Sequence, residues 1–252
     1  MFQSFNKFIL DILFPIHCLF CKKYGDWICD ECFKKINLLP EQVCPYCEKN
    51  ISPAGRICQN CKEKFLEKNQ KYPLDALIVS AKYQKDGIAR LIYNFKYNFI
   101  KDLGDPLARI VSQAIILHNL PLPDLIIPVP LHPKRLRWRG FNQAEILARN
   151  ISEELAPGLP ILVVTNLLVR RKYTSAQMKI KSYQERQKNV KNTFALNEEF
   201  IGLGIFKNKT ILLVDDVSTT GATLFECAQV LKSFGAKKVY GAVIARQEIK
   251  KV

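Results

Sequence analysis

Glycine, proline and long apolar runs are scarce in this sequence. Its 252 residues include 11 glycines and 13 prolines, too few for a fibrous or low-complexity protein. No apolar stretch approaches the roughly 20 residues that a bilayer-spanning helix needs, so no transmembrane segment is predicted. Hydrophobic residues nevertheless make up 48% of the chain, which excludes a disordered protein and supplies material for a buried core.

Acidic residues are also in deficit. The chain has 23 Asp and Glu against 38 Lys and Arg, which gives a formal net charge of +15. This excess says nothing about the fold, but it favours polyanionic partners, namely phosphorylated small molecules, nucleic acid or anionic lipid.

Cysteine, by contrast, is concentrated in the first quarter of the chain. Of the nine cysteines, all but Cys227 fall in C-x-x-C pairs. These pairs are Cys18/Cys21, Cys29/Cys32, Cys44/Cys47 and Cys58/Cys61. Each pair forms a knuckle that offers two sulfurs to one metal, so the pattern predicts two structural Zn²⁺ ions with four thiolate ligands each. We expect the first and second pairs to share one ion and the third and fourth pairs to share the other. A crossed arrangement of pairs remains open.

A disulfide framework or a set of redox-active dithiols is the alternative to zinc. Disulfides need an oxidising compartment, and the amino terminus does not read as a secretory signal, because Asp11 interrupts its apolar stretch and no small-residue cleavage site precedes Cys18. Zinc is therefore favoured. So small a segment would hardly fold without metal, and we expect metal removal to unfold residues 18–61 and largely to spare 74–246.

The cysteine-rich segment is predicted to be a domain of its own. Residues 2–14 carry apolar side chains at helical spacing, which indicates a short amphipathic helix packed on the zinc module or, alternatively, docked on a membrane surface or a partner. We therefore expect a helix and double zinc ribbon over 1–61, a charged linker over 62–73 and a second domain over 74–252.

The second domain alternates strands with helices. Strands are predicted at 75–83, 124–130, 159–164, 209–217 and 237–246, and helices at 86–98, 105–118, 222–235 and from 142 onward. This alternation predicts an α/β fold with a parallel, doubly wound sheet.

The segment 212–223 carries the most specific chemistry. A buried strand delivers Asp215 and Asp216 to its carboxyl end, and a hydroxyl-rich turn, Gly221 and a predicted helix follow. Ligands of open α/β sheets bind at the carboxyl ends of strands, and a helix N-terminus offers free N–H groups to an anion. One side of this turn therefore suits a phosphate, and the other suits sugar hydroxyls or a hydrated metal. It is not a Walker loop, because the sequence lacks G-x-x-x-x-G-K-[ST].

This segment resembles the motif by which type I phosphoribosyltransferases bind phosphoribosyl diphosphate (PRPP). The resemblance implies that Asp215 and Asp216 hold the ribose hydroxyls, with Mg²⁺ bound mainly by the diphosphate. It also implies that backbone N–H groups cradle the 5′-phosphate in a turn formed by Thr219, Thr220, Gly221, Ala222 and Thr223. The alternative is an acidic strand end that only caps the next helix, for which one acid would be enough.

Residues 128–149 and 170–194, together with the cysteine-rich head, resemble the ComF family, whose members are linked to DNA uptake in natural competence. The matching positions of the second segment are Arg170, Thr174, Gln177, Arg186 and Asn189. The resemblance covers about 14–246 and implies a type I phosphoribosyltransferase-like domain behind a double zinc ribbon. It further implies a cytoplasmic protein, with the inner membrane face as a candidate docking surface and competence helicase and translocation proteins as candidate partners.

A basic segment follows the strand over 124–130. Lys134, Arg135, Arg137 and Arg139 are predicted to form a loop at the same sheet edge as Asp215. Arg135 and Arg139, with Lys96 as a second candidate, suit the diphosphate of PRPP. A second interpretation is that the loop follows the backbone of single-stranded DNA with Trp138 stacked on a base, and a third is that it is merely solvated.

Two functions therefore compete. The first is a Mg²⁺-dependent PRPP-binding protein that transfers ribose 5-phosphate to an acceptor the sequence does not identify. The second is a non-catalytic accessory factor of the competence machinery that binds single-stranded DNA. The two are not exclusive.

Overall fold

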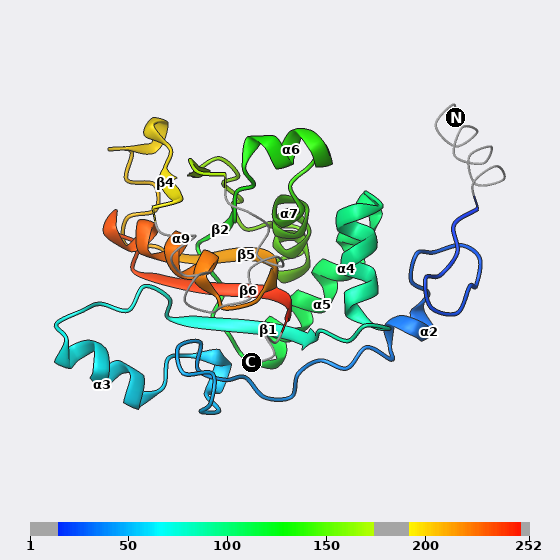
Figure 1. Ribbon diagram of the computed structural model, residues 1–252, viewed down its shortest axis with the longest axis horizontal. Helices are drawn as coiled ribbons and strands as arrows, with labels where there is room; N and C mark the ends of the chain where they lie inside the picture. Colours follow the sequence, from blue (N-terminus) through cyan, green and yellow to red (C-terminus); the bar gives the residue numbers. More distant parts are fainter. Residues whose placement is uncertain (1–14, 174–191, 248–252) are drawn as a thin grey trace.

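The computed structural model describes residues 15–173 and 192–247 (Figure 1). The helix expected over 2–14 and the positions Thr174, Gln177, Arg186 and Asn189 lie outside these ranges. Helices occupy Asp30–Phe33 (α2), Gln59–Glu67 (α3), Ile88–Tyr97 (α4), Gly104–Leu117 (α5), Pro133–Arg139 (α6), Gln143–Leu155 (α7) and Ala222–Ser233 (α9), with short 3₁₀ helices at Pro53–Gly55, Lys101–Leu103 and Glu198–Phe200. Strands occupy Ala76–Lys82 (β1), Leu125–Pro128 (β2), Leu168–Arg170 (β3), Phe194–Leu196 (β4), Thr210–Ser218 (β5) and Lys238–Arg246 (β6).

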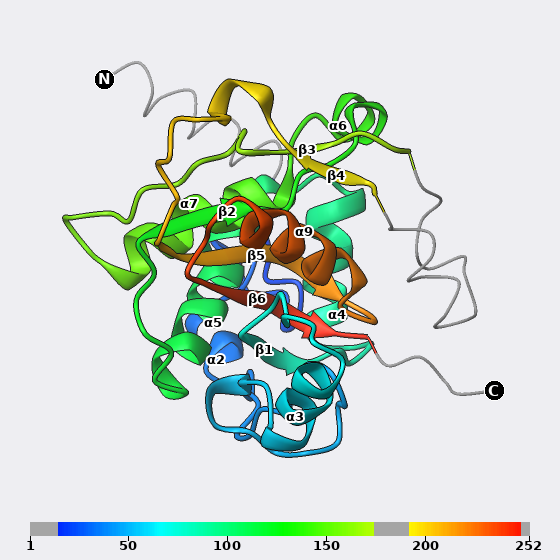
Figure 2. The ribbon, with the colours of Figure 1, turned by 90° about the vertical axis from the view of Figure 1, so that its left-hand side faces the viewer.

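A four-stranded parallel sheet forms the centre of the molecule. Its strands lie in the order β1-β6-β5-β2, and β5 pairs with β6 from Thr210↔Lys238 to Ser218↔Arg246. Helices α5 and α7 pack on one face of this sheet, and α9 packs on the other together with the small antiparallel β3-β4 pair (Figures 1 and 2). The predicted parallel α/β architecture is confirmed.

Side chains of β5 alternate between two buried layers, one on each face of the sheet. Ile211 and Leu213 pack in the layer beneath α9, whereas Leu212 and Val214 pack in the layer formed with α4, α5 and α7. Alternate side chains of a strand point to opposite faces, so Asp215 continues the first row and Asp216 the second. The two acids of the motif therefore leave β5 on opposite faces.

The cysteine-rich segment covers the outer edge of β1, as Figure 2 shows. The backbone N–H of Leu39 donates to the Ser80 carbonyl at 2.9 Å. The Gln42 amide takes the place of a strand neighbour, because its Nε2 donates to the Val79 carbonyl at 3.0 Å and its Oε1 accepts from the Val79 N–H at 2.9 Å. An edge strand that would otherwise offer unpaired backbone groups is thereby satisfied. Helix α3 runs into the expected 62–73 linker, and the domain boundary itself stays a prediction.

Two predicted elements differ from the structure. The basic segment expected to be a loop is helix α6, with Pro133 in its first turn and Gly140 at its C-cap with φ +77°. Proline at the start and a left-handed glycine at the end are ordinary helix boundaries, and here they enclose one short helix. The strand expected over 159–164 is reduced to one parallel bridge between Ile126 and Val163.

Candidate functional site

The eight paired cysteines form two clusters of four thiols. The first thiol cluster consists of Cys18, Cys21, Cys29 and Cys32, and the second thiol cluster consists of Cys44, Cys47, Cys58 and Cys61. Within each cluster all sulfurs lie within 4.8 Å of one another. Tetrahedral zinc with Zn–S bonds of about 2.3 Å places its sulfurs about 3.8 Å apart, so both clusters fit this ion. The preferred sequential pairing is confirmed, and the crossed arrangement is excluded.

The two thiol clusters are built alike. A left-handed residue follows the first knuckle of each cluster, Lys22 with φ 66° and Glu48 with φ 56°. The second pair of each cluster begins a short helix, because Cys29 is the N-cap of α2 and Cys58 the N-cap of α3. Burial raises the pKa of the Cys18 thiol, but backbone N–H groups of neighbouring residues outweigh it and lower the value to about 6. The backbone N–H groups around Cys18 therefore favour its thiolate, the form that binds metal, whereas burial raises the pKa of the Cys32 thiol in the same cluster.

The turn between β5 and α9 has the shape of an anion cradle. Gly221, with φ +73°, is the N-cap of α9 and lets the backbone turn sharply into the helix. Thr219, Gly221, Ala222 and Thr223 line a small cavity at this turn. Thr220 plays another part than expected: its side chain is buried, and its Oγ1 accepts from the Ala222 N–H at 3.3 Å. Thr220 therefore holds the turn in shape and does not line the cradle.

Asp216 pairs with a lysine from the neighbouring helix. Its Oδ1 lies 2.7 Å from Lys96 Nζ on α4, with side chains that are 11% and 18% exposed. The same oxygen accepts from the Val217 N–H at 2.6 Å. Lys96, expected to contact diphosphate, is thus tied to the acid in this structure, and both side chains line the same cavity. The pair brings a positive and a negative group to one wall of the site.

Asp215 faces the opposite side of β5. Its Oδ1 accepts from the Asp216 N–H at 2.8 Å. Burial raises the pKa of Asp215 from 3.8 to about 7, and the neighbouring charge of Asp216 acts in the same direction, while Lys96 and Arg170 partly oppose it. Near neutral pH this carboxyl group is therefore poised between its protonated and ionised forms.

Asp215 should make the stability of the protein depend on pH. A folded-state pKa of about 7 against 3.8 means that the folded protein keeps a proton which the unfolded chain has lost. This contribution to stability is complete below the unfolded value and disappears as pH rises through about 7. We expect the free energy of unfolding in urea to fall less for Asp215→Asn than for the wild type between about pH 6 and pH 8. Equal slopes for the two proteins would contradict the shifted pKa.

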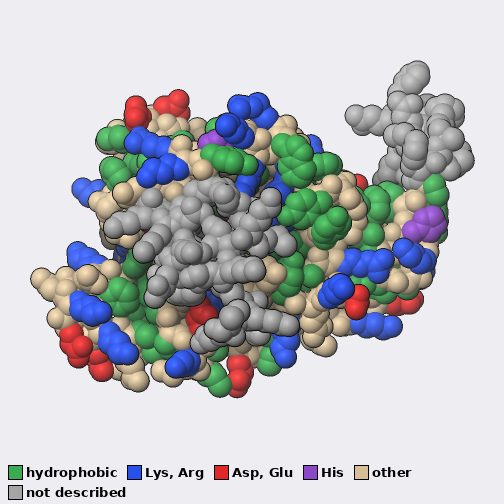
Figure 3. All heavy atoms as spheres, viewed as in Figure 1, with side chains coloured by type: hydrophobic (Ala, Val, Ile, Leu, Met, Phe, Trp, Pro, Cys, Tyr) green, Lys and Arg blue, Asp and Glu red, His purple; other side chains and the backbone are tan. Residues whose placement is uncertain are grey.

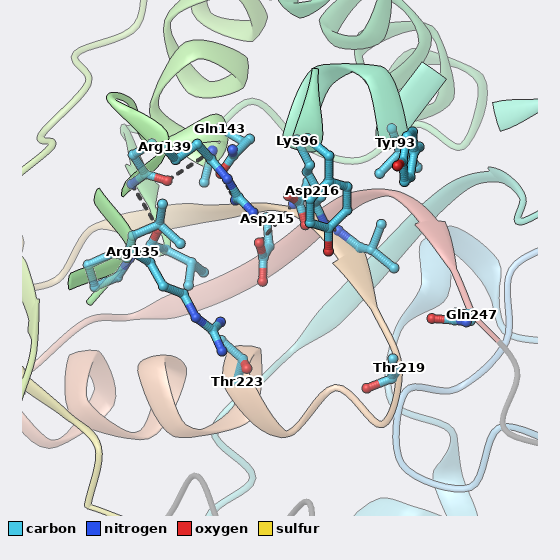
Figure 4. Close-up of a pocket in the computed structure, with 18 of the residues that line it drawn as sticks. Tyr93, Lys96, Arg135, Arg139, Gln143, Asp215, Asp216, Thr219, Thr223 and Gln247 are labelled. Atoms are coloured by element: carbon cyan, nitrogen blue, oxygen red, sulfur yellow. Dashed lines mark hydrogen bonds and ion pairs between the residues drawn. The ribbon is translucent and has the colours of Figure 1, made fainter. Parts of the chain in front are cut away.

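Basic side chains from three elements surround the acids. Arg139, on α6, donates from Nη1 to Gln143 Oε1 at 2.6 Å, and burial lowers the pKa of its guanidinium. Arg135, also on α6, extends toward Thr223 at the start of α9 (Figure 4). Arg170, at the end of β3, lines the same cavity and acts electrostatically on Asp215. The predicted site residues Lys96, Arg135 and Arg139 are therefore brought together with the acids.

These residues enclose one cavity of about 310 Å³ at the carboxyl edge of the sheet. That volume is at the lower end of the range for small-ligand sites, roughly 300–1,000 Å³. Several lining residues were missed by the sequence analysis, namely Tyr83, Tyr93, Asn142, Gln143 and Gln247. Gln143 is 1% exposed, and among the described residues its Nε2 has no hydrogen-bond partner. A polar ligand or a water molecule in the cavity would satisfy this donor.

A row of exposed aromatic rings begins at the wall of this cavity, which Tyr93 and Tyr97 line. We define the aromatic ledge as the row Tyr93, Tyr97, Trp138 and Phe99, in which the centroids of neighbouring rings lie 5.1 to 6.4 Å apart. Trp138 is 61% exposed and Tyr93 is 57% exposed. Arg139 lies 5.7 Å from both the Tyr97 and Trp138 rings. Figure 3 shows Lys and Arg side chains gathered beside hydrophobic side chains over α6 and α4.

Two family models match separate parts of the chain. A family model described as a double zinc ribbon domain matches residues 9–62, and one described as a phosphoribosyl transferase domain matches residues 139–252. Competence protein F of Haemophilus influenzae is 31% identical over 243 residues, covering 92% of this chain and 98% of that protein. The chain belongs to the competence protein F family.

Other members of this family have similar extents. DNA utilization protein YhgH of Salmonella typhi is 30% identical over 233 residues, covering 89% of this chain and 94% of that protein. Competence protein ComFC of Streptococcus pneumoniae is 29% identical over 215 residues, covering 84% of each chain. The expected ComF membership and type I phosphoribosyltransferase-like fold with a zinc-ribbon head are confirmed. In the described part of the chain, every helix is too short or too polar to cross a bilayer.

Proposed function

We propose that this protein binds PRPP with Mg²⁺ at the carboxyl edge of its sheet and transfers ribose 5-phosphate to an acceptor. The observation that carries this proposal is the cavity lined jointly by Asp215, Asp216, Thr219, Thr223 and the cations of α4, α6 and β3. Acids for sugar hydroxyls, a helix N-terminus for a phosphate and guanidinium groups for a diphosphate are the three requirements of this ligand.

Each group has a distinct task in the proposed site. The turn from Thr219 to Thr223 receives the 5′-phosphate, and Asp215 and Asp216 hold the ribose hydroxyls. Arg139 faces the diphosphate and stabilises the charge that develops on it as its bond to the sugar carbon breaks. Arg135, whose side chain extends toward Thr223 (Figure 4), can reach the 5′-phosphate turn as well as the diphosphate. Mg²⁺, a hard cation that prefers oxygen ligands, would neutralise the diphosphate and weaken that bond.

Calorimetric titration with PRPP and Mg²⁺ tests this proposal. Binding should depend on Mg²⁺ and should be much tighter for PRPP than for ribose 5-phosphate or diphosphate alone, because each fragment engages only half of the site. If PRPP binds no better than diphosphate, the pocket recognises a simple polyanion and the proposal is wrong.

The aromatic ledge supports a second function, binding of single-stranded DNA. Base stacking on aromatic rings beside a cationic groove is the usual mode of sequence-independent single-strand binding. The ledge and the cations of α6 provide both parts within one surface. Relatives named for competence and DNA utilization make a role in DNA uptake the natural setting, with proteins of the competence machinery as partners.

Trp138→Ala should weaken single-stranded DNA binding about 10-fold, because stacking of one base on an aromatic ring is worth roughly 1–3 kcal/mol. Tyr24→Ala is the control, since Tyr24 is 62% exposed in the zinc-ribbon segment and its ring packs against His17, which is not part of the ledge. Fluorescence anisotropy with an oligothymidine measures both variants. The log–log dependence of wild-type affinity on salt should have a slope of about −0.7 for each phosphate contacted. An equal loss in both variants, or a salt-independent affinity, contradicts this function.

A further inference from the structure

We call the turn over residues 219–223 the phosphate turn, after its proposed ligand. An aromatic ring forms its floor. A Cβ placed on Gly221 would lie 2.9 Å from Phe225 Cε2, so the ring of Phe225 packs closely against the α-carbon of the turn itself. The Phe225 N–H also donates to the Gly221 carbonyl at 2.9 Å, which closes the first turn of α9. Any displacement of this ring therefore changes the support of the backbone that forms the cradle.

A ring from the second thiol cluster holds Phe225 in place. Tyr46 lies between Cys44 and Cys47 in the chain, and its ring centroid is 4.9 Å from that of Phe225 with an interplanar angle of 31°. The hydroxyl of Tyr46 accepts from the Leu74 N–H and donates to the Leu74 carbonyl, both at 2.9 Å. The Phe65 ring, on α3, packs edge-on against Tyr46 at 5.0 Å. Tyr46 is thus fixed on several sides, and Phe225 rests on a rigid support.

The first thiol cluster is attached elsewhere. Its aromatic neighbour Phe33 lies under the guanidinium of Arg109 at 4.7 Å, on helix α5. Phe33 packs in the buried layer on the face opposite α9, whereas Tyr46 and Phe225 pack in the layer beneath α9. Aromatic neighbours of the two chemically equivalent thiol clusters therefore pack on opposite faces of the same sheet. Within the described ranges, only the second thiol cluster has such a neighbour, Tyr46, in contact with the ring beneath the phosphate turn.

We propose that Tyr46 is a positioning residue that transmits the state of the second thiol cluster through Phe225 to the phosphate turn at Gly221. Zinc in the second thiol cluster fixes the knuckle that carries Tyr46, Tyr46 fixes Phe225, and Phe225 fixes the backbone of the cradle. The proposal rests on the proposed function for the identity of the ligand. Because coupling between two sites is reciprocal, PRPP should in turn stabilise the second thiol cluster and leave the first unaffected.

Hydrogen exchange without any ligand tests the mechanical part. Tyr46→Leu should retain two zinc ions per chain and exchange the amides of residues 219–223 about 10-fold faster than the wild type, because the floor of the turn loses its support. Tyr46→Phe keeps the ring and should stay close to the wild type. Phe33→Leu, the matched change at the first thiol cluster, should leave 219–223 unchanged. If Tyr46→Leu does not fold, Phe225→Leu tests the same support of the turn. The proposal is wrong if either variant, loaded with zinc, exchanges the amides of 219–223 at the rate of the wild type.

Ligand binding tests the coupling. Affinity for PRPP should fall about 10-fold in Tyr46→Leu and hardly change in Tyr46→Phe, and PRPP should slow alkylation of the second set of cysteines only, as resolved by peptide mass spectrometry. Equal protection of both sets, or of neither, by PRPP that binds overturns the coupling. If the wild type does not bind PRPP at all, the proposed function fails, while the exchange measurement still decides on the role of Tyr46.

Discussion

Asp216→Asn is expected to lower the affinity for PRPP by about 100-fold or more, because a carboxylate that accepts from sugar hydroxyls is replaced by a weaker, neutral acceptor. The same change should destabilise the fold by about 2 kcal/mol, since it leaves the largely buried ammonium of Lys96 without its carboxylate partner at 2.7 Å. Calorimetry with PRPP and Mg²⁺ measures the first effect, and urea unfolding measures the second.

The variant Lys96→Met with Asp216→Asn separates these two effects. Removing both members of a buried pair avoids an uncompensated charge, so stability should return toward that of the wild type. Affinity for PRPP should stay low, because the acid is still absent. Recovery of PRPP binding along with stability would show that Asp216 acts only by holding the fold together, and its proposed contact with ribose would be wrong.

Removing zinc is expected to have the largest effect on structure. Apparent binding free energies of structural zinc sites, about 10–16 kcal/mol, match or exceed the whole stability of a typical domain. A chelator under reducing conditions should therefore unfold residues 18–61. The structure adds that β1 should be affected too, because Leu39 and Gln42 satisfy its outer edge. An uncovered parallel edge strand favours aggregation.

Hydrogen exchange and light scattering check this result. Amides of residues 76–82 should lose protection together with 18–61, scattering should rise, and added zinc should reverse the exchange when aggregation is prevented. The amides of β5, in the sheet interior, provide the control and should stay protected. Metal analysis that finds fewer than two zinc ions per chain, or unchanged exchange in β1 after chelation, would contradict this account.

The two thiol clusters and the turn between β5 and α9 could be predicted because their signals are local. A C-x-x-C knuckle is complete within four residues, and the acids, Gly221 and the start of α9 follow one another within one short segment. Helix α6 was missed although Pro133 and Gly140 marked its ends, because seven basic and apolar residues without an acidic cap resemble a loop. Arg170 was noted only as one position of a family spacing pattern. That pattern did not indicate that Arg170 lines the same cavity as the two acids.

The sequence by itself determined which groups are present: eight thiols for two metals, two acids at a strand end and a glycine that allows a left-handed turn. Tertiary structure alone decided their relations. The pleat of β5 sends Asp216 to Lys96 and Asp215 to the side of Arg170, and the docking of the ribbon along β1 brings Tyr46 beneath Phe225. Residues 46 and 225 are far apart in the chain, so their contact depends on how the buried layers pack, and that packing is a property of the whole fold.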